Sequence, residues 1–123
     1  FGKGSAEWIA TLLDAESIRA VMREAVEYAG VAGAGTALAG RIAVRQGTNT
    51  QGETVTYLLN YSADEVTIDS PVSGDVVVAP VVVGTDGTVD ESATAAIALK
   101  EGSKVEVGDR LTIGRWNVVV IAG

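Results

Sequence analysis

The sequence predicts a mainly β protein, in which an antiparallel β-sandwich or barrel-like C-terminal domain follows one βα unit from an α/β domain. Two observations favour the β-domain. Beyond Arg41 no apolar stripe of helical period appears, whereas short runs of β-branched residues recur. Glycine-containing turns separate these runs at the short spacing typical of antiparallel sheets. A third observation, a long apolar run followed by an amphipathic stretch, predicts the βα unit.

The N-terminal segment has the pattern of a strand followed by a helix. Ala6–Leu13 is almost continuously apolar, as in strands that are covered on both faces. Asp14 supplies an N-cap for a helix predicted over Ala15–Ala29, and Gly30 is placed to end it. The apolar stripe of this helix has the spacing i, i+3, i+4, i+7 and i+8 and consists of Ile18, Val21, Met22, Ala25 and Val26.

A change of composition marks a domain boundary. One βα unit cannot form an α/β domain alone, so residues 1–30 are predicted to be the terminal strand and helix of such a domain. Glycine and alanine dominate residues 31–40, which we interpret as a linker. Residues 41–123 are predicted to form the antiparallel β-domain.

Val55–Tyr61 is the predicted central strand of the β-domain. Alternation places Val55, Tyr57, Leu59 and Tyr61 on one apolar face, which we expect to pack on the core. Val66–Ile68 follows after a short polar turn, so a hairpin between the two is expected. The remaining strand candidates are Ile42–Arg45, Val76–Val78, Val81–Val83 after the break at Pro80, Ala95–Leu99, Lys104–Val107, Arg110–Ile113 and Trp116–Ile121.

Composition excludes several classes of function. The 123 residues include no cysteine and no histidine, so thiolate metal sites and histidine-based catalysis are excluded. The net charge of −7 argues against nucleic acid and anionic membranes as partners. No apolar stretch is long enough to span a membrane, and no signal peptide is recognisable. The lack of cysteine is compatible with a cytoplasmic location, which we expect, and from the start at Phe1 we expect the chain to be a fragment.

The acidic residues offer no convincing catalytic or metal site. Asp64 with Glu65, and Asp90 with Glu91, are adjacent carboxylates that a glycosidase pair would require in a cleft, but both pairs fall in loops. Asp86 could join Asp90 and Glu91 around calcium, although the spacing matches no known loop. We interpret all of them as solvated turn residues and predict no catalytic, cofactor-binding or metal residue in this chain, and no cofactor.

Four aromatic residues could stack on sugars: Trp8, Tyr57, Tyr61 and Trp116. Because all four fall in strand patterns, core packing is the preferred interpretation. Asn60-Tyr61-Ser62 matches a glycosylation acceptor, which we take as coincidental within a strand.

The order of these parts carries a resemblance to a known family. Gly2-Lys3-Gly4-Ser5 precedes the first strand, Leu12-Leu13-Asp14-Ala15-Glu16-Ser17 opens the helix, and Tyr57-Leu58-Leu59-Asn60-Tyr61-Ser62 lies in the β-domain before a Val-rich terminal strand. This arrangement resembles the C-terminal end of bacterial β-galactosidases of glycoside hydrolase family 42. The family often has Pro-Tyr-Gly before its last strand, where this sequence has Gly114-Arg115-Trp116-Asn117.

The resemblance implies a non-catalytic role for this chain. In that family a catalytic (β/α)₈ barrel is followed by an α/β trimerisation domain and then by a small antiparallel β-domain. Residues 1–30 would end the trimerisation domain, and the catalytic glutamates would lie in the missing barrel. The chain would be a non-catalytic C-terminal fragment of a retaining β-galactosidase that hydrolyses terminal non-reducing β-D-galactose residues. Its partners would be the missing barrel and middle domain, within a homo-oligomer.

Two other classes remain open. A carbohydrate-binding or adhesin-like β-sandwich module would expose a cluster of the aromatic residues, whereas burial of all four would favour a structural module. A free-standing enzyme would need a cleft with convergent carboxylates.

Overall fold

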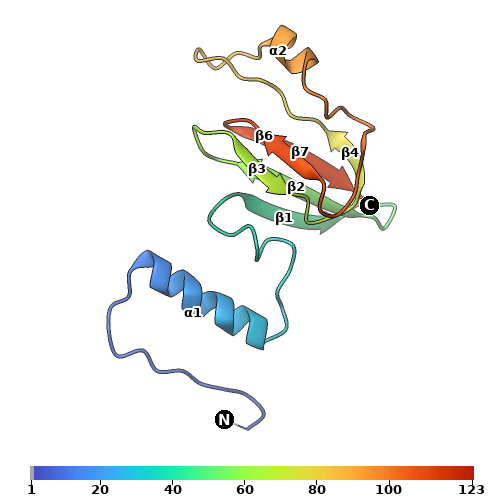
Figure 1. Ribbon diagram of the computed structural model, residues 1–123. Helices are drawn as coiled ribbons and strands as arrows, with labels where there is room; N and C mark the ends of the chain where they lie inside the picture. Colours follow the sequence, from blue (N-terminus) through green and yellow to red (C-terminus); the bar gives the residue numbers. More distant parts are fainter. Residues whose placement is uncertain (1) are drawn as a thin grey trace. The chain divides into compact units, whose positions relative to one another are not determined.

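The structure is a computed structural model that describes residues 2–123. The chain divides into two compact units, Phe1–Ala32 and Gly33–Gly123 (Figure 1). The second unit is mainly β with antiparallel sheets, as the sequence predicts. Among the described residues, no helix is both long and apolar enough to cross a membrane.

The first unit contains helix α1, Ala15–Tyr28. The Asp14 side chain accepts a hydrogen bond from the Ser17 backbone N–H at 2.7 Å, which confirms the predicted N-cap. Gly30 has a φ of +66°, the left-handed conformation that ends the helix after Tyr28. The helix was therefore predicted to within one residue at its C-terminal end.

The strand predicted over Ala6–Leu13 is absent, and this segment is irregular chain. A strand is stable only when its backbone N–H and C=O groups pair with a neighbour, and no described residue of the first unit forms a strand for this segment. Trp8 is 90% exposed and Leu12 is 100% exposed. Ala6–Leu13 therefore has the composition of a buried strand, but the described part of the first unit lacks the neighbouring strand that would pair with it and cover it.

The second unit has two sheets. Its five-stranded sheet has the order β1-β2-β7-β4-β5, and β3 pairs with β6 in a separate two-stranded sheet. The strands are β1 (Ala43–Thr48), β2 (Thr54–Asn60), β3 (Val66–Asp69), β4 (Gly74–Val78), β5 (Lys104–Val105), β6 (Arg110–Ile113) and β7 (Asn117–Ala122). Helix α2 (Glu91–Ala95) lies in the long connection between β4 and β5 (Figure 1).

The core lies where the two sheets face each other. The large sheet contributes the fully buried Leu58, Val119 and Ile121, and the small sheet contributes Ile68 and Ile113. β2 of the large sheet and β6 of the small sheet bury alternate residues, which is the burial pattern of a sandwich.

The prediction of which face of β2 packs on the core is wrong. Its core-facing residues are Thr56, Leu58 and Asn60, whereas Tyr57 is 42% exposed and Leu59 is half-buried. Polar residues can occupy this face because hydrogen bonds satisfy them. Thr56 accepts from Gln46 Nε2 at 3.0 Å, and the Asn60 amide donates to backbone carbonyls.

The expected hairpin between β2 and β3 is also wrong. β2 is flanked by β1 and β7, so both of its edges are occupied, and β3 crosses to the second sheet. The turn between them is fixed by side chains, since Ser62 Oγ donates to the Asp64 carbonyl at 2.9 Å. This local bonding competes with a simple two-strand reversal.

Part of the predicted linker belongs to the β unit. The division between the units falls at residues 32–33, inside the range 31–40, but Leu38 is buried in the core together with Ile42. A Cβ added at Gly35 would lie 3.2 Å from the Val44 Cβ, so this segment approaches β1 closely. A single leucine in a stretch of small residues is enough to anchor it.

Three other strand predictions need correction. Ala95–Leu99 is not a strand: Ala95 is the last residue of the short helix α2, which Asp90 caps by accepting from the Ala93 N–H at 2.9 Å, and residues 96–99 are irregular chain. Val81–Val83 forms only a single bridge, between Val83 and Val89, after Pro80 interrupts the run. The strand predicted over Lys104–Val107 ends at Val105.

Alanine substitution distinguishes the two orientations of β2. Leu58→Ala should lower the free energy of unfolding by about 2–5 kcal/mol, because Leu58 is fully buried and its removal leaves a cavity. Leu59→Ala should cost clearly less, since Leu59 lies on the opposite, half-buried face. Urea denaturation of both variants measures the difference, and a larger loss for Leu59→Ala would restore the orientation that the sequence pattern indicates.

The N-cap of α1 predicts a pH dependence. Hydrogen bonds from the Ser17 backbone, and then from its hydroxyl, lower the pKa of Asp14 below its ordinary value of 3.8. Because the pKa is depressed in the folded state, the cap stabilises the helix above pH 3.8, and this stabilisation is lost as pH falls through the lower, folded value. Far-UV circular dichroism should show that the wild type loses helicity on acidification relative to Asp14→Asn, which caps without titrating there. Identical acid titrations of the two proteins would refute this role for Asp14.

Candidate functional site

The turn between β6 and β7 is the most unusual backbone feature of the second unit. Trp116 has a φ of +51°, and no other non-glycine residue within 2–123 has a positive φ. This conformation is unfavourable for a bulky side chain, so the surroundings must hold it. The Trp116 N–H donates to the Ser62 carbonyl at 3.1 Å, which fixes the turn against the end of β2.

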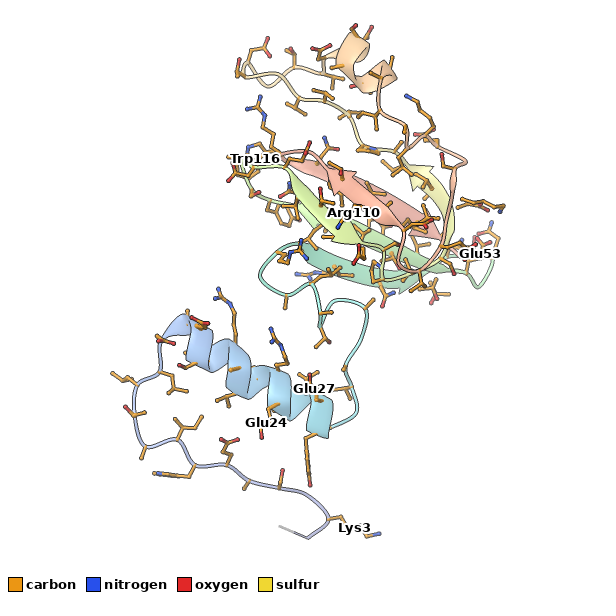
Figure 2. All side chains as sticks on the ribbon, in the orientation of Figure 1. Lys3, Glu24, Glu27, Glu53, Arg110 and Trp116 are labelled. Atoms are coloured by element: carbon orange, nitrogen blue, oxygen red, sulfur yellow. The ribbon has the colours of Figure 1, made fainter. Side chains whose placement is uncertain are left out.

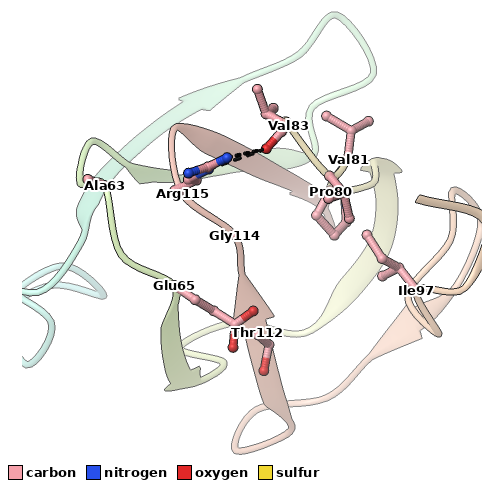
Figure 3. A pocket seen from close by; sticks show the side chains of 10 residues that line it. Ala63, Glu65, Pro80, Val81, Val83, Ile97, Thr112, Gly114 and Arg115 are labelled. Atoms are coloured by element: carbon pink, nitrogen blue, oxygen red, sulfur yellow. Dashed lines mark hydrogen bonds between the residues drawn. The ribbon is translucent and has the colours of Figure 1, made fainter. Parts of the chain in front are cut away.

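A pocket of about 380 Å³ opens beside this turn (Figure 3). One side consists of Thr112 of β6 and Glu65, the residue before β3, and another is Arg115 with the backbone of Val83 (Figure 3). Pro80, Val81 and Ile97 supply apolar surface from the connection between β4 and β5. The pocket thus combines apolar walls with a few polar groups, the usual composition of small-molecule sites.

Arg115 is held in place at one edge of the pocket. Its Nε and Nη2 both donate to the Val83 carbonyl, at 3.3 Å and 2.9 Å (Figure 3). A guanidinium has five N–H donors, so further donors remain for another acceptor. Within residues 2–123 the structure gives Arg115 no ion pair.

Glu65 is the one carboxylate among the described residues that line this pocket. Its side chain is exposed and makes no hydrogen bond or ion pair within the described part of the chain. A glycosidase requires two carboxyl groups across a scissile bond, and this pocket supplies a single one. The arrangement can bind a ligand, but it lacks the pair needed for glycoside hydrolysis.

The loop that forms the apolar wall is pinned by hydrogen bonds. The Asn117 side chain accepts from the Val81 N–H at 3.2 Å and donates to the Val81 carbonyl. The Val82 N–H donates to Thr94 Oγ1 at 2.8 Å. Together with Arg115, these bonds hold the wall in place before any ligand arrives.

The aromatic residues do not pack in the core, contrary to the prediction. Trp116 is 61% exposed and Tyr61 is 67% exposed, and both lie just beyond the facing pair Asn60 and Asn117 of the β2–β7 ladder. Figure 2 labels Trp116 at the turn that it occupies. Tyr57 shares this exposure on the outer face of the sheet, and Trp8 is exposed in the first unit. The strand patterns were misleading because two of these residues follow or precede a strand and a third faces outward.

Two of the other acidic candidates have local structural roles. Asp90 caps α2, and Asp86 accepts from the Thr88 N–H at 3.0 Å in a turn. The Thr88 backbone and then its hydroxyl lower the pKa of Asp86. In the part of the chain that the structure describes, no group of three or more acidic side chains could hold a metal ion.

Asn60 is not presented as a glycosylation acceptor. Its side chain is 2% exposed, and its Nδ2 donates to the carbonyls of Asp64, Ile113 and Gly114. The amide nitrogen that would carry a glycan is therefore buried and already forms hydrogen bonds within the β unit.

The pocket was not predicted, although one signal pointed to it. Its polar residues come from β6, the β6–β7 turn and the residue before β3, and its wall comes from the β4–β5 connection, in which Val83 lies 32 residues from Arg115. Gly114-Arg115, a glycine-containing separator between the last two strand candidates, marked the same turn. No model of a known protein family matches the chain, and no curated protein matches it either.

Proposed function

We propose that this chain is a non-catalytic C-terminal module of a β-galactosidase, with a structural role in assembly. The observation that carries the proposal is the uncovered apolar surface of the first unit. Trp8 and Leu12 are almost entirely exposed, and no residue of α1 is buried. Several large exposed apolar side chains in one small unit indicate a place where another protein surface packs.

The chemistry of that surface indicates its partner. Ala6–Leu13 has the composition of a strand covered on both faces, and α1 presents Ile18 and Met22, which are about half exposed. A neighbouring parallel strand and its helices would cover both elements, as in an α/β domain. The partner is therefore the rest of the parent's α/β domain, together with the catalytic barrel that comes before that domain.

The parent would hydrolyse terminal non-reducing β-D-galactose residues with retention of configuration, as a cytoplasmic homo-oligomer. The acid/base and nucleophile would lie outside this chain, which accords with the single carboxylate in its pocket. The sequence resemblance over residues 1–30 and 57–62 supports this choice of parent.

Activity and assembly test the proposal together. The complete product of the gene that encodes this sequence should hydrolyse a chromogenic aryl β-galactoside, whereas residues 1–123 should not. In the complete product, Leu12→Asp should destabilise the assembly by about 1.5–3 kcal/mol or more, the value of burying a leucine side chain. Thermal unfolding and sedimentation measure this, with Glu7→Gln, an exposed polar neighbour, as the matched control.

Two results would contradict the proposal. One is turnover by residues 1–123 that a single Asp or Glu substitution abolishes. The other is a complete gene product that lacks β-galactosidase activity, or one in which Leu12→Asp and Glu7→Gln behave alike.

A second candidate function is saccharide binding by the β unit. The exposure of Tyr57, Tyr61 and Trp116 favours it, because exposed aromatic side chains offer flat surfaces for the C–H faces of sugars. Tyr61 and Trp116 leave the same end of the β2–β7 ladder, so they lie on neighbouring chain segments. This function is compatible with a place in a larger enzyme.

A further inference from the structure

We propose that the pocket beside the β6–β7 turn binds one pyranose unit of a saccharide through Glu65 and Arg115. The inference rests on the saccharide-binding candidate and gives that function a site. It is independent of whether the parent is a β-galactosidase.

The two charged side chains specify a neutral, polyhydroxylated ligand. Glu65 offers carboxylate oxygens that accept from hydroxyl groups, and Arg115 offers N–H groups that donate to hydroxyl oxygens. The two residues line one pocket, yet they form no ion pair within residues 2–123. An anion would be repelled by Glu65 and a cation by Arg115, whereas sugar hydroxyls both donate and accept and so suit both groups.

The apolar wall suits the remaining surface of a sugar ring. Pro80, Val81 and Ile97 face the same cavity, and a pyranose presents C–H groups between its hydroxyls. The volume of about 380 Å³ lies at the small end of ligand pockets, roughly 300–1,000 Å³, which suits a single ring. Trp116 follows Arg115 directly and is exposed, so the next sugar unit would find an aromatic surface nearby.

Arg115 and the apolar wall are held in place before binding. Arg115 is oriented by the Val83 carbonyl, and the wall is held by the Asn117 side chain and by Thr94. Binding therefore requires little ordering of these groups, which favours recognition of a small ligand.

The test is a titration of the ¹⁵N-labelled 123-residue chain with methyl β-D-galactopyranoside, methyl β-D-glucopyranoside and lactose, followed by NMR. At least one of these should shift the amides around Glu65, Val81–Val83 and Thr112–Trp116, with a dissociation constant on the order of millimolar for a single ring. Glu65→Gln keeps the size of the side chain and removes its charge, and it should weaken binding about tenfold. Asp64→Asn is the matched control, because the Asp64 side chain lies outside the pocket lining, and it should bind as the wild type does.

Arg115→Met is a second variant that retains the aliphatic stem and should also weaken binding about tenfold. The dispersion of the spectrum reports whether each variant is folded, and Glu65 makes no bond on which folding depends.

The other outcomes overturn the proposal in distinguishable ways. If saccharides shift only the amides around Tyr57, Tyr61 and Trp116, and Glu65→Gln binds normally, the β unit binds sugars elsewhere and the pocket is not the site. If no saccharide causes shifts, the saccharide-binding function fails along with its site. If the zwitterion alanine shifts the pocket amides and the pyranosides do not, the ligand class is wrong.

Discussion

The arrangement of the β unit depends on the side chain of Asn60 at the end of β2. Its Nδ2 donates to the carbonyls of Asp64, Ile113 and Gly114, at 2.8, 3.1 and 2.9 Å. Its Oδ1 accepts from the backbone N–H and the hydroxyl of Ser62. One buried amide thus joins the central strand, the turn that leads to β3, and the end of β6. A buried polar group with all its partners satisfied fixes one arrangement, since any other would leave it unpaired.

The hydrogen bonds of Asn60 also fix part of the candidate site. Gly114 follows the last residue of β6, and Arg115 and Trp116 come directly after it, so the contacts of Asn60 fix the start of the turn that carries them. Asn117 faces Asn60 in the ladder, and its side chain accepts a hydrogen bond from the N–H of Val81 in the apolar wall of the pocket. Two facing asparagines therefore connect both sides of the pocket to the centre of the larger sheet.

Short-range patterns predicted most of the helices and strands. Helix α1 was found because its spacing and its Asp14 cap specify it, and most strands were found because runs of β-branched residues between turns mark their positions. The face of β2 was not, because Thr56 and Asn60 are polar residues that become buried through partners elsewhere, in one case 53 residues away. The alternation of apolar residues favoured burial of the face that carries Tyr57, whereas hydrogen bonds to distant residues allow the opposite face to be buried.

The same distinction explains the other differences. Ala6–Leu13 has strand composition but no partner strand among the described residues, and a strand exists only as one of a pair. The pocket could not be predicted because Glu65, Pro80, Ile97 and Arg115 are brought together by the crossing of β3 to the second sheet and by the long β4–β5 connection. Neither the crossing of β3 nor the path of the β4–β5 connection can be predicted from the spacing of residues along the chain.

The central role of Asn60 is tested most directly by the stability of Asn60→Ala, with the exposed neighbour Tyr61→Ala as the control. Removal of the amide takes away the donor to the carbonyls of Ile113 and Gly114, and a buried carbonyl without a partner costs about 1–3 kcal/mol, so Asn60→Ala should lower the free energy of unfolding by at least about 2 kcal/mol. It should also shift the amide resonances of Ser62 and Gly114. An Asn60→Ala protein that unfolds at the same urea concentration as the wild type, with those resonances unmoved, would contradict the account.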